Sequence, residues 1–235
     1  FLDIITNNKR VVIQGAAGTG KTLLAIEVAR RNFSEQKKTL FLCFNSNLGQ
    51  YLKNELEPLK EYVEFQTVWK YLMGFINIYE EIEGAKPELI RKIKSLNISN
   101  FEDICECLNE IFLSGKSRPQ YESIIIDEAQ LVLNQHFIDS LDLLLSGGLK
   151  EGGYLFFMDI HQSVKGNYLT EIKKLIKDHN CTTFPLSTNY RNTEEIGLLC
   201  KILCNFNPYK DFKMKGSNTQ LNKYVPYSSV IDQLN

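Results

Sequence analysis

The sequence predicts an α/β fold in which a parallel β-sheet is covered by helices on both faces. Apolar runs that are typical of buried strands alternate along the chain with segments of helical periodicity. The expected strands are residues 11–13, 39–44, 63–68, 123–126, 154–158 and 182–186, and the expected helices are 21–33, 47–56, 134–145, 169–177 and 193–206. Such alternation indicates parallel strands joined by crossover helices.

A glycine-rich stretch between the first strand and the first helix predicts a phosphate-binding loop. Its residues are Gly15, Ala16, Ala17, Gly18, Thr19, Gly20, Lys21 and Thr22. The glycines allow positive φ angles, so that successive backbone N–H groups can point at phosphate oxygens, and the helix N-terminus adds further donors. We expect Lys21 to reach the β- and γ-phosphates and Thr22 to ligate Mg²⁺ through its hydroxyl.

Two carboxylates follow the apolar run 124–126 and predict the second half of this site. At the carboxyl edge of a parallel sheet they would lie beside the phosphate loop. Asp127 is expected to hold Mg²⁺, and Glu128 to accept a proton from the water that attacks the γ-phosphate. The alternative is that Asp127 caps the next helix. Beside a phosphate loop we prefer the catalytic interpretation, and the adjacent pair predicts hydrolysis.

Composition places the chain among ordinary globular proteins. It has 235 residues, of which 43% are hydrophobic and 23% charged, and no apolar run approaches the roughly 18 residues of a membrane span. The net charge of −1 gives no support to general nucleic-acid binding. The six cysteines form no Cys-x-x-Cys pair, so zinc is not expected, and free thiols suit a reducing cytoplasm.

The pattern changes after the third strand. Residues 70–115 carry helical periodicity without a clear strand, which predicts a helical insertion in an α/β domain made of residues 1–69 and 116–206. Residues 207–222 are polar and turn-rich, and residues 223–227 could form an edge strand because Pro226 interrupts them. We therefore expect residues 207–235 to form a linker and the start of a second domain that the chain does not contain.

Six ordered segments resemble the first motor domain of superfamily 1 helicases of the UvrD/Rep type. They are residues 15–22, 40–48, 67–69, 127–130, 158–163 and 189–193, and the resemblance runs from about residue 10 to residue 206. It implies a RecA-like P-loop NTPase that binds ATP and Mg²⁺ and couples hydrolysis to movement on single-stranded DNA or, as the second choice, RNA. Because the family's adenine-reading glutamine would precede Phe1, ATP is implied by the resemblance alone.

The resemblance also implies roles for residues outside the phosphate loop. Gln162 would contact the γ-phosphate or the attacking water, and Arg191 would be an arginine finger. Gln130 would couple the metal site to neighbouring motifs, whereas Met158 stands where the family has glycine. The alternatives are a surface glutamine after a strand for Gln162 and a helix-capping ion pair for Arg191.

The nucleic-acid side of the resemblance rests on fewer residues. Asn45, Asn47, Thr67 and Trp69 match positions along the family's groove, and Lys165 could contact phosphate where the family often carries an aromatic. Trp69 would either stack on a base or anchor the inserted helices. Without the second motor domain the chain alone is not expected to unwind nucleic acid. The alternative function is a regulatory ATP-binding module of a defence or signalling protein that does not translocate.

Overall fold

The chain forms two compact units, Phe1–Ser187 and Thr188–Asn235. The computed structural model describes residues 2–81, 91, 101–113, 118–162, 168–204 and 208–216. The first unit ends at Ser187, before residue 206, where the sequence predicts the end of the α/β domain. The boundary at residue 206 stays a prediction. No helix in the described part of the chain is long and apolar enough to cross a membrane.

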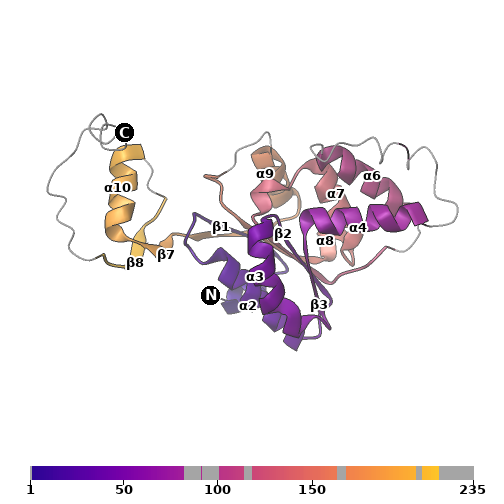
Figure 1. Cartoon of the computed structure of the whole chain (residues 1–235), viewed down its shortest axis with the longest axis horizontal. Coiled ribbons are helices and arrows are strands. Elements are labelled where there is room, and N and C mark those ends of the chain that lie inside the picture. Colours follow the sequence, from indigo (N-terminus) through magenta and orange to yellow (C-terminus); the bar gives the residue numbers. More distant parts are fainter. Residues whose placement is uncertain are drawn as a thin grey trace, which may run out of the picture. The chain divides into compact units, whose positions relative to one another are not determined.

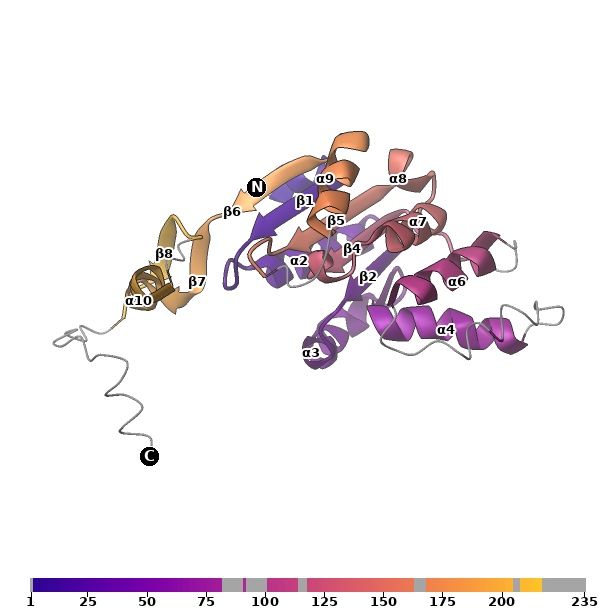
Figure 2. The ribbon, with the colours of Figure 1, turned by 90° about the horizontal axis from the view of Figure 1, so that it is seen from above.

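A six-stranded parallel sheet forms the centre of the first unit (Figure 1). In spatial order its strands are β3 (Val63–Thr67), β2 (Thr39–Cys43), β4 (Ser123–Asp127), β5 (Gly153–Met158), β1 (Arg10–Gly15) and β6 (Thr182–Leu186). Each expected strand is present, so the predicted parallel α/β sheet is confirmed. Since all strands run the same way, their carboxyl ends meet at one edge, as Figure 2 shows for β1, β5 and β4.

Helices cover both faces of this sheet. They are α1 (Leu2–Thr6), α2 (Lys21–Ser34), α3 (Ser46–Leu56), α4 (Val68–Glu81), α6 (Phe101–Leu113), α7 (Gln135–Leu144), α8 (Gly148–Glu151) and α9 (Tyr168–Asp178), with short 3-10 turns η1 (Glu57–Leu59) and η2 (Ala129–Leu131). The described part of the expected insertion, α4 and α6, is helical as predicted.

The core divides into two clusters because successive strand residues point to opposite faces. Ile13 and Phe41 pack with α1, α2 and α3, whereas the adjacent Val12 and Leu40 pack with α4, α6, α7, α8 and α9. Figure 1 shows α2 and α3 on one side of the sheet and α7 and α9 on the other. Strands buried on both faces explain why the sequence reads as continuous apolar runs.

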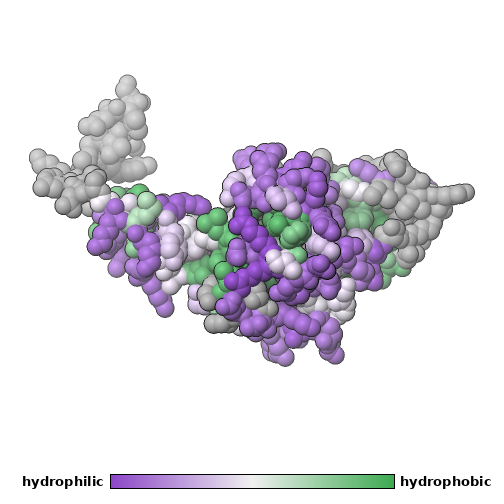
Figure 3. Space-filling view, turned by 90° about the horizontal axis from the view of Figure 1, so that it is seen from below, coloured by the Kyte–Doolittle hydropathy of each residue, from purple (hydrophilic) through white to green (hydrophobic). Residues whose placement is uncertain are grey.

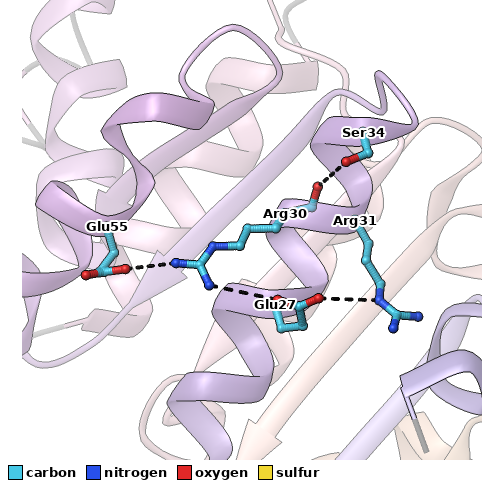
Figure 4. A network of polar contacts seen from close by, with 5 residues as sticks. All are labelled: Glu27, Arg30, Arg31, Ser34 and Glu55. Atoms are coloured by element: carbon cyan, nitrogen blue, oxygen red, sulfur yellow. Dashed lines mark hydrogen bonds and ion pairs between the residues drawn. The ribbon is translucent and has the colours of Figure 1, made fainter.

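Polar side chains cover much of the face that carries α2 and α3 (Figure 3). On it, Arg30 of α2 reaches Glu55 of α3 at 3.0 Å and Glu27 of its own helix at 3.9 Å (Figure 4). The Arg30 and Glu55 side chains are 50% and 36% exposed, so this ion pair contributes at most about 1 kcal/mol. Apolar burial in the two clusters therefore holds the helices to the sheet.

A buried pair of tyrosines ties helix α4 to the sheet. The Tyr121 hydroxyl donates to Glu64 Oε2 at 2.6 Å, and the Tyr71 hydroxyl donates to the Tyr121 oxygen at 3.3 Å. Burial raises the pKa of both phenols above the usual range, so both remain neutral donors. The Tyr121 oxygen is thus the only acceptor recorded for the Tyr71 hydroxyl among the described residues.

Tyr121→Phe is expected to lower the free energy of unfolding by about 1–3 kcal/mol. The variant keeps the ring but leaves the Tyr71 hydroxyl, which is 3% exposed, without its acceptor. Urea denaturation followed by circular dichroism measures the difference. Tyr51→Phe is the matched control because Tyr51 is 44% exposed, and it should leave the stability unchanged. Equal stabilities for the two variants would show that the tyrosine pair contributes nothing.

The second unit contains a β-α-β arrangement. Strand β7 (Thr188–Thr193), helix α10 (Glu194–Cys204) and strand β8 (Asp211–Met214) follow one another, and the two strands pair in parallel. The expected helix at 193–206 is confirmed as α10. The sequence patterns predict neither β7, which contains no apolar run, nor β8, which lies in the polar, turn-rich segment 207–222. The predicted strand at 223–227 lies outside the described residues.

Candidate nucleotide site

The glycine-rich loop joins β1 to α2 with an unusual backbone. Gly18 and Gly20 have φ angles of 84° and 86°, a region that side chains disfavour. Gly15 is required for a different reason, because a Cβ there would lie 2.4 Å from Thr19 Oγ1. The Thr19 hydroxyl donates to the Ala16 carbonyl at 2.8 Å and closes the loop upon itself. The predicted loop geometry is therefore present.

A buried cation lies against this loop. Lys21 is 6% exposed, and its ammonium donates to the Gly15 carbonyl at 2.8 Å and to the Ala16 carbonyl at 3.3 Å. Within the described residues no side chain caps the N-terminus of α2, which begins at Lys21. Backbone N–H groups and the helix dipole remain directed out of this end, and both favour an anion. The loop thus fits a polyphosphate group.

The two expected magnesium ligands lie in direct contact. The Thr22 hydroxyl donates to Asp127 Oδ2 at 2.7 Å, although the residues are far apart in sequence. Asp127 ends β4 with no exposed surface, and its Oδ1 accepts the Glu128 N–H at 3.1 Å. Burial raises the pKa of the Asp127 carboxyl, and the hydrogen bond from Thr22 opposes this shift. A hydroxyl beside a carboxylate is a hard oxygen pair that suits Mg²⁺.

Glu128 follows in a left-handed conformation, with φ 59° and ψ 41°. Its Oε2 accepts the side-chain N–H of Gln130 at 2.7 Å. Gln130 is 1% exposed, and its own carbonyl oxygen accepts the backbone N–H of Asp159, just after β5, at 3.0 Å. The amide therefore links the ends of β4 and β5, while the coupling role that the resemblance implies for it stays a prediction. A residue strained at such a point is typical of functional sites.

In the described part of the chain, the side chain of Gln162 makes no hydrogen bond to Asp127, Glu128 or the phosphate loop. Gln162 is exposed in the turn after β5, and its backbone N–H donates to the Asp159 carbonyl at 3.2 Å. Since β5 lies between β4 and β1, this turn shares the edge at which the phosphate loop lies. Arg191 is exposed on β7 in the second unit. The roles of both residues stay predictions.

The residues proposed for nucleic acid have varied surroundings. Asn45 caps α3, because its Oδ1 accepts the N–H groups of Asn47 at 2.9 Å and of Leu48 at 3.4 Å. Asn47 is exposed, and Thr67 is half-buried at the end of β3. The Trp69 ring packs edge-to-face on Phe101 of α6, with 5.5 Å between the ring centroids. This packing agrees with the alternative in which Trp69 anchors the inserted helices. Lys165 lies outside the described residues.

The parallel sheet, the phosphate loop and the carboxylates at the end of a neighbouring strand define a P-loop NTPase fold. A family model described as Schlafen group 3, DNA/RNA helicase domain, matches residues 8–200. The chain belongs to this family of helicase domains. No curated protein sequence matches it significantly.

Three solved structures are similar to this chain at low sequence identity. The cytoplasmic domain of the Type VII secretion ATPase EccC from Thermomonospora curvata has a TM-score of 0.41 and 9% identity over 78% of this chain. The Pyrococcus furiosus Hef helicase domain has a TM-score of 0.39 and 12% identity over 78% of this chain. AMPPCP-bound DnaA from Aquifex aeolicus has a TM-score of 0.38 and 13% identity over 99% of this chain. The chain spans 20%, 36% and 52% of these chains, respectively. At such TM-scores none of them bears on the activity of this chain.

Proposed function

We propose that the chain is the ATP-binding and ATP-hydrolysing core of a superfamily 1 helicase-like motor of the UvrD/Rep type. The full protein would couple hydrolysis to movement on single-stranded DNA, with RNA as the second choice. The observation that carries this proposal is the 2.7 Å contact between the Thr22 hydroxyl and Asp127 Oδ2. It joins the start of the phosphate-loop helix to the acidic end of β4 and so supports a single site for a magnesium nucleotide.

The phosphate loop would bind the nucleotide through its backbone. The loop of Gly15, Ala16, Ala17, Gly18, Thr19 and Gly20 would turn backbone N–H groups toward the phosphates, beside the open end of α2. Lys21 would exchange its two loop carbonyls for phosphate oxygens. Thr22 and Asp127 would hold Mg²⁺, which supplies charge neutralisation on the β- and γ-phosphates. The buried Asp127 carboxyl must be ionised for this role.

Glu128 is the residue that we assign as general base. Because the side-chain amide of Gln130 already donates a hydrogen bond to Glu128 Oε2, Glu128 Oε1 would take the proton from the attacking water. Gln162 and Arg191 would sense the γ-phosphate, and Arg191 would neutralise charge on the transferring group. Because Gln130 also binds the backbone of Asp159, a change at the γ-phosphate could reach the turn that carries Gln162.

A two-domain motor is supported by the second unit. The parallel β7–α10–β8 arrangement would suit the start of a second α/β sheet, and it leaves apolar side chains of α10 exposed, namely Ile196, Leu198, Leu199, Ile202 and Leu203. We therefore retain a second motor domain as a partner. The domain limits 1–69 and 116–206, 70–115, and 207–235 stay sequence-based predictions, and the second unit, which begins at Thr188, would start this partner domain earlier than residue 207. We also retain a cytoplasmic location as a prediction, which rests on the cysteine pattern of the sequence.

The ATPase rate of the full-length protein, measured with and without single-stranded DNA, tests the motor. We expect strong stimulation by an oligonucleotide and weaker stimulation by RNA of the same sequence. The stimulation should decline as salt rises, because phosphate contacts release counterions. A rate that nucleic acid leaves unchanged would contradict the motor.

The second candidate is the regulatory ATP-binding module that does not translocate. Trp69 favours it, because the ring packs on Phe101, and Asn45 favours it, because its oxygen already caps α3. The net charge of −1 points the same way. This candidate predicts ATP binding with a rate that is insensitive to nucleic acid.

A further inference from the structure

Asn189 has a buried side chain that organises the backbone of the residues after it. It has no exposed surface, and its Oδ1 accepts the backbone N–H of Arg191 at 2.8 Å and that of Asn192 at 2.9 Å. Both partners are donors, so the orientation of the amide is fixed by its contacts. Asn189 Oδ1 thus binds two successive backbone N–H groups, in the way that Asn side chains stabilise turns.

The same residues interrupt the pairing of β7 with β8. Asn189 pairs with Phe212 and Thr193 with Met214, so Tyr190–Asn192 stand opposite Lys213 alone. Irregularities of this bulge type re-aim side chains and occur beside active sites. Here Tyr190 is 56% exposed, and Arg191 is also exposed. The buried Asn189 is therefore the anchor of a bulge whose outer side carries Arg191.

The asparagine at this position also carries a cost in stability. Among the described residues, the Asn189 Nδ2 group is buried with no hydrogen-bond partner. A buried donor left unpaired costs about 1–3 kcal/mol. Aspartate would supply the same acceptor oxygen and place a second, buried carboxylate oxygen where the unpaired Nδ2 lies, so Asn189→Asp preserves the anchor at some cost in stability. Alanine removes the anchor.

We propose that Asn189 is a positioning residue for Arg191, fixing the direction in which the guanidinium leaves the bulge. This inference rests on the proposed role of Arg191 in neutralising the transferring phosphoryl group. Such a role needs the guanidinium in one place, because misplacement by about 1 Å can cost on the order of 10²-fold in rate. Without the two hydrogen bonds, the segment Tyr190–Asn192 samples other conformations and Arg191 loses its fixed direction.

The test compares variants of the full-length protein in steady-state ATP hydrolysis. Asn189→Ala is expected to lower kcat about 10- to 100-fold with a much smaller change in KM, and Asn189→Asp is expected to restore kcat. Asn134→Ala is the matched control: Asn134 is 3% exposed, caps α7 through the Phe137 N–H at 2.8 Å and also has an unpaired Nδ2 in the described structure. It should lose stability but not kcat.

A double variant separates positioning from general damage. If Asn189 acts through Arg191, then Asn189→Ala should have no further effect on kcat in an Arg191→Ala background. A normal kcat for Arg191→Ala alone would contradict the proposed role of Arg191. A slow Arg191→Ala variant together with a normal Asn189→Ala variant, or additive losses in the double variant, would overturn the positioning inference and leave the proposed function intact.

A readout that needs no hydrolysis completes the test. Amide hydrogen exchange at Arg191 and Asn192 reports the two bonds to Asn189 directly. Asn189→Ala should make both amides exchange faster, whereas Asn189→Asp should keep them protected. Unchanged protection in the alanine variant would overturn the inference even in a protein without measurable ATPase activity.

Discussion

Glu128→Gln is expected to lower kcat for ATP hydrolysis by about 10²- to 10⁴-fold while ATP still binds. The glutamine amide has nearly the shape of the carboxylate but cannot accept the proton from water. Removing a negative charge close to the phosphates should leave affinity equal to, or tighter than, that of the wild type. The variant should therefore accumulate in the ATP-bound state.

The structure gives a reason for this variant to fold normally. Gln130 donates to Glu128 Oε2 at 2.7 Å, and the carbonyl oxygen of a glutamine at this position can accept the same bond. The left-handed backbone at residue 128 is equally strained for both side chains. A loss of rate would then report lost proton transfer and not a collapsed site.

Single-turnover hydrolysis and equilibrium binding of a fluorescent ATP analogue measure the two effects separately. Glu122→Gln is the matched control, because Glu122 immediately precedes the other end of the same strand, β4, where its Oε2 accepts the Lys38 N–H at 3.0 Å. It should hydrolyse ATP at the wild-type rate. If Glu128→Gln did so too, Glu128 would not be the general base.

Sequence patterns predicted the first unit well because its information is local. A five-residue apolar run such as Leu40–Phe44 is typical of a strand that is buried on both faces of its sheet. The glycine loop is recognisable because its backbone requires glycine at closely spaced positions. The meeting of Thr22 and Asp127 followed from topology, since both lie at the carboxyl edge of one parallel sheet.

Other features depend on contacts that no local pattern encodes. Strand β7 reads Thr-Asn-Tyr-Arg-Asn-Thr, which has no apolar run, and it becomes a strand by pairing with β8. Trp69 could be assigned to packing only once Phe101, from a distant helix, was placed beside it. The Asn189 anchor had one available clue, an asparagine two residues before Arg191, which is the spacing of an Asx turn.

Lys21→Ala is expected to raise the Kd for ATP about 10²-fold or more. In the proposed complex the ammonium faces phosphate in a site where it is 6% exposed, and truncating one partner of a buried charge pair costs about 2–5 kcal/mol. Isothermal titration calorimetry with ATP and Mg²⁺ measures the loss. Lys60→Ala is the control for removing a lysine, because Lys60 pairs only with Glu57 at an exposed position among the described contacts, and its Kd should be unchanged.

The same substitution also removes two hydrogen bonds within the loop, to the Gly15 and Ala16 carbonyls, so part of the loss could come from a loosened loop. Thr19→Ala separates the two causes, because it deletes the 2.8 Å bond to the Ala16 carbonyl without removing a charge. If the charge dominates, Thr19→Ala should lower the melting temperature yet keep measurable binding, while Lys21→Ala loses it. Equal losses in both variants would attribute the effect to loop order, and wild-type affinity in Lys21→Ala would mean that the loop does not bind ATP phosphates through this lysine.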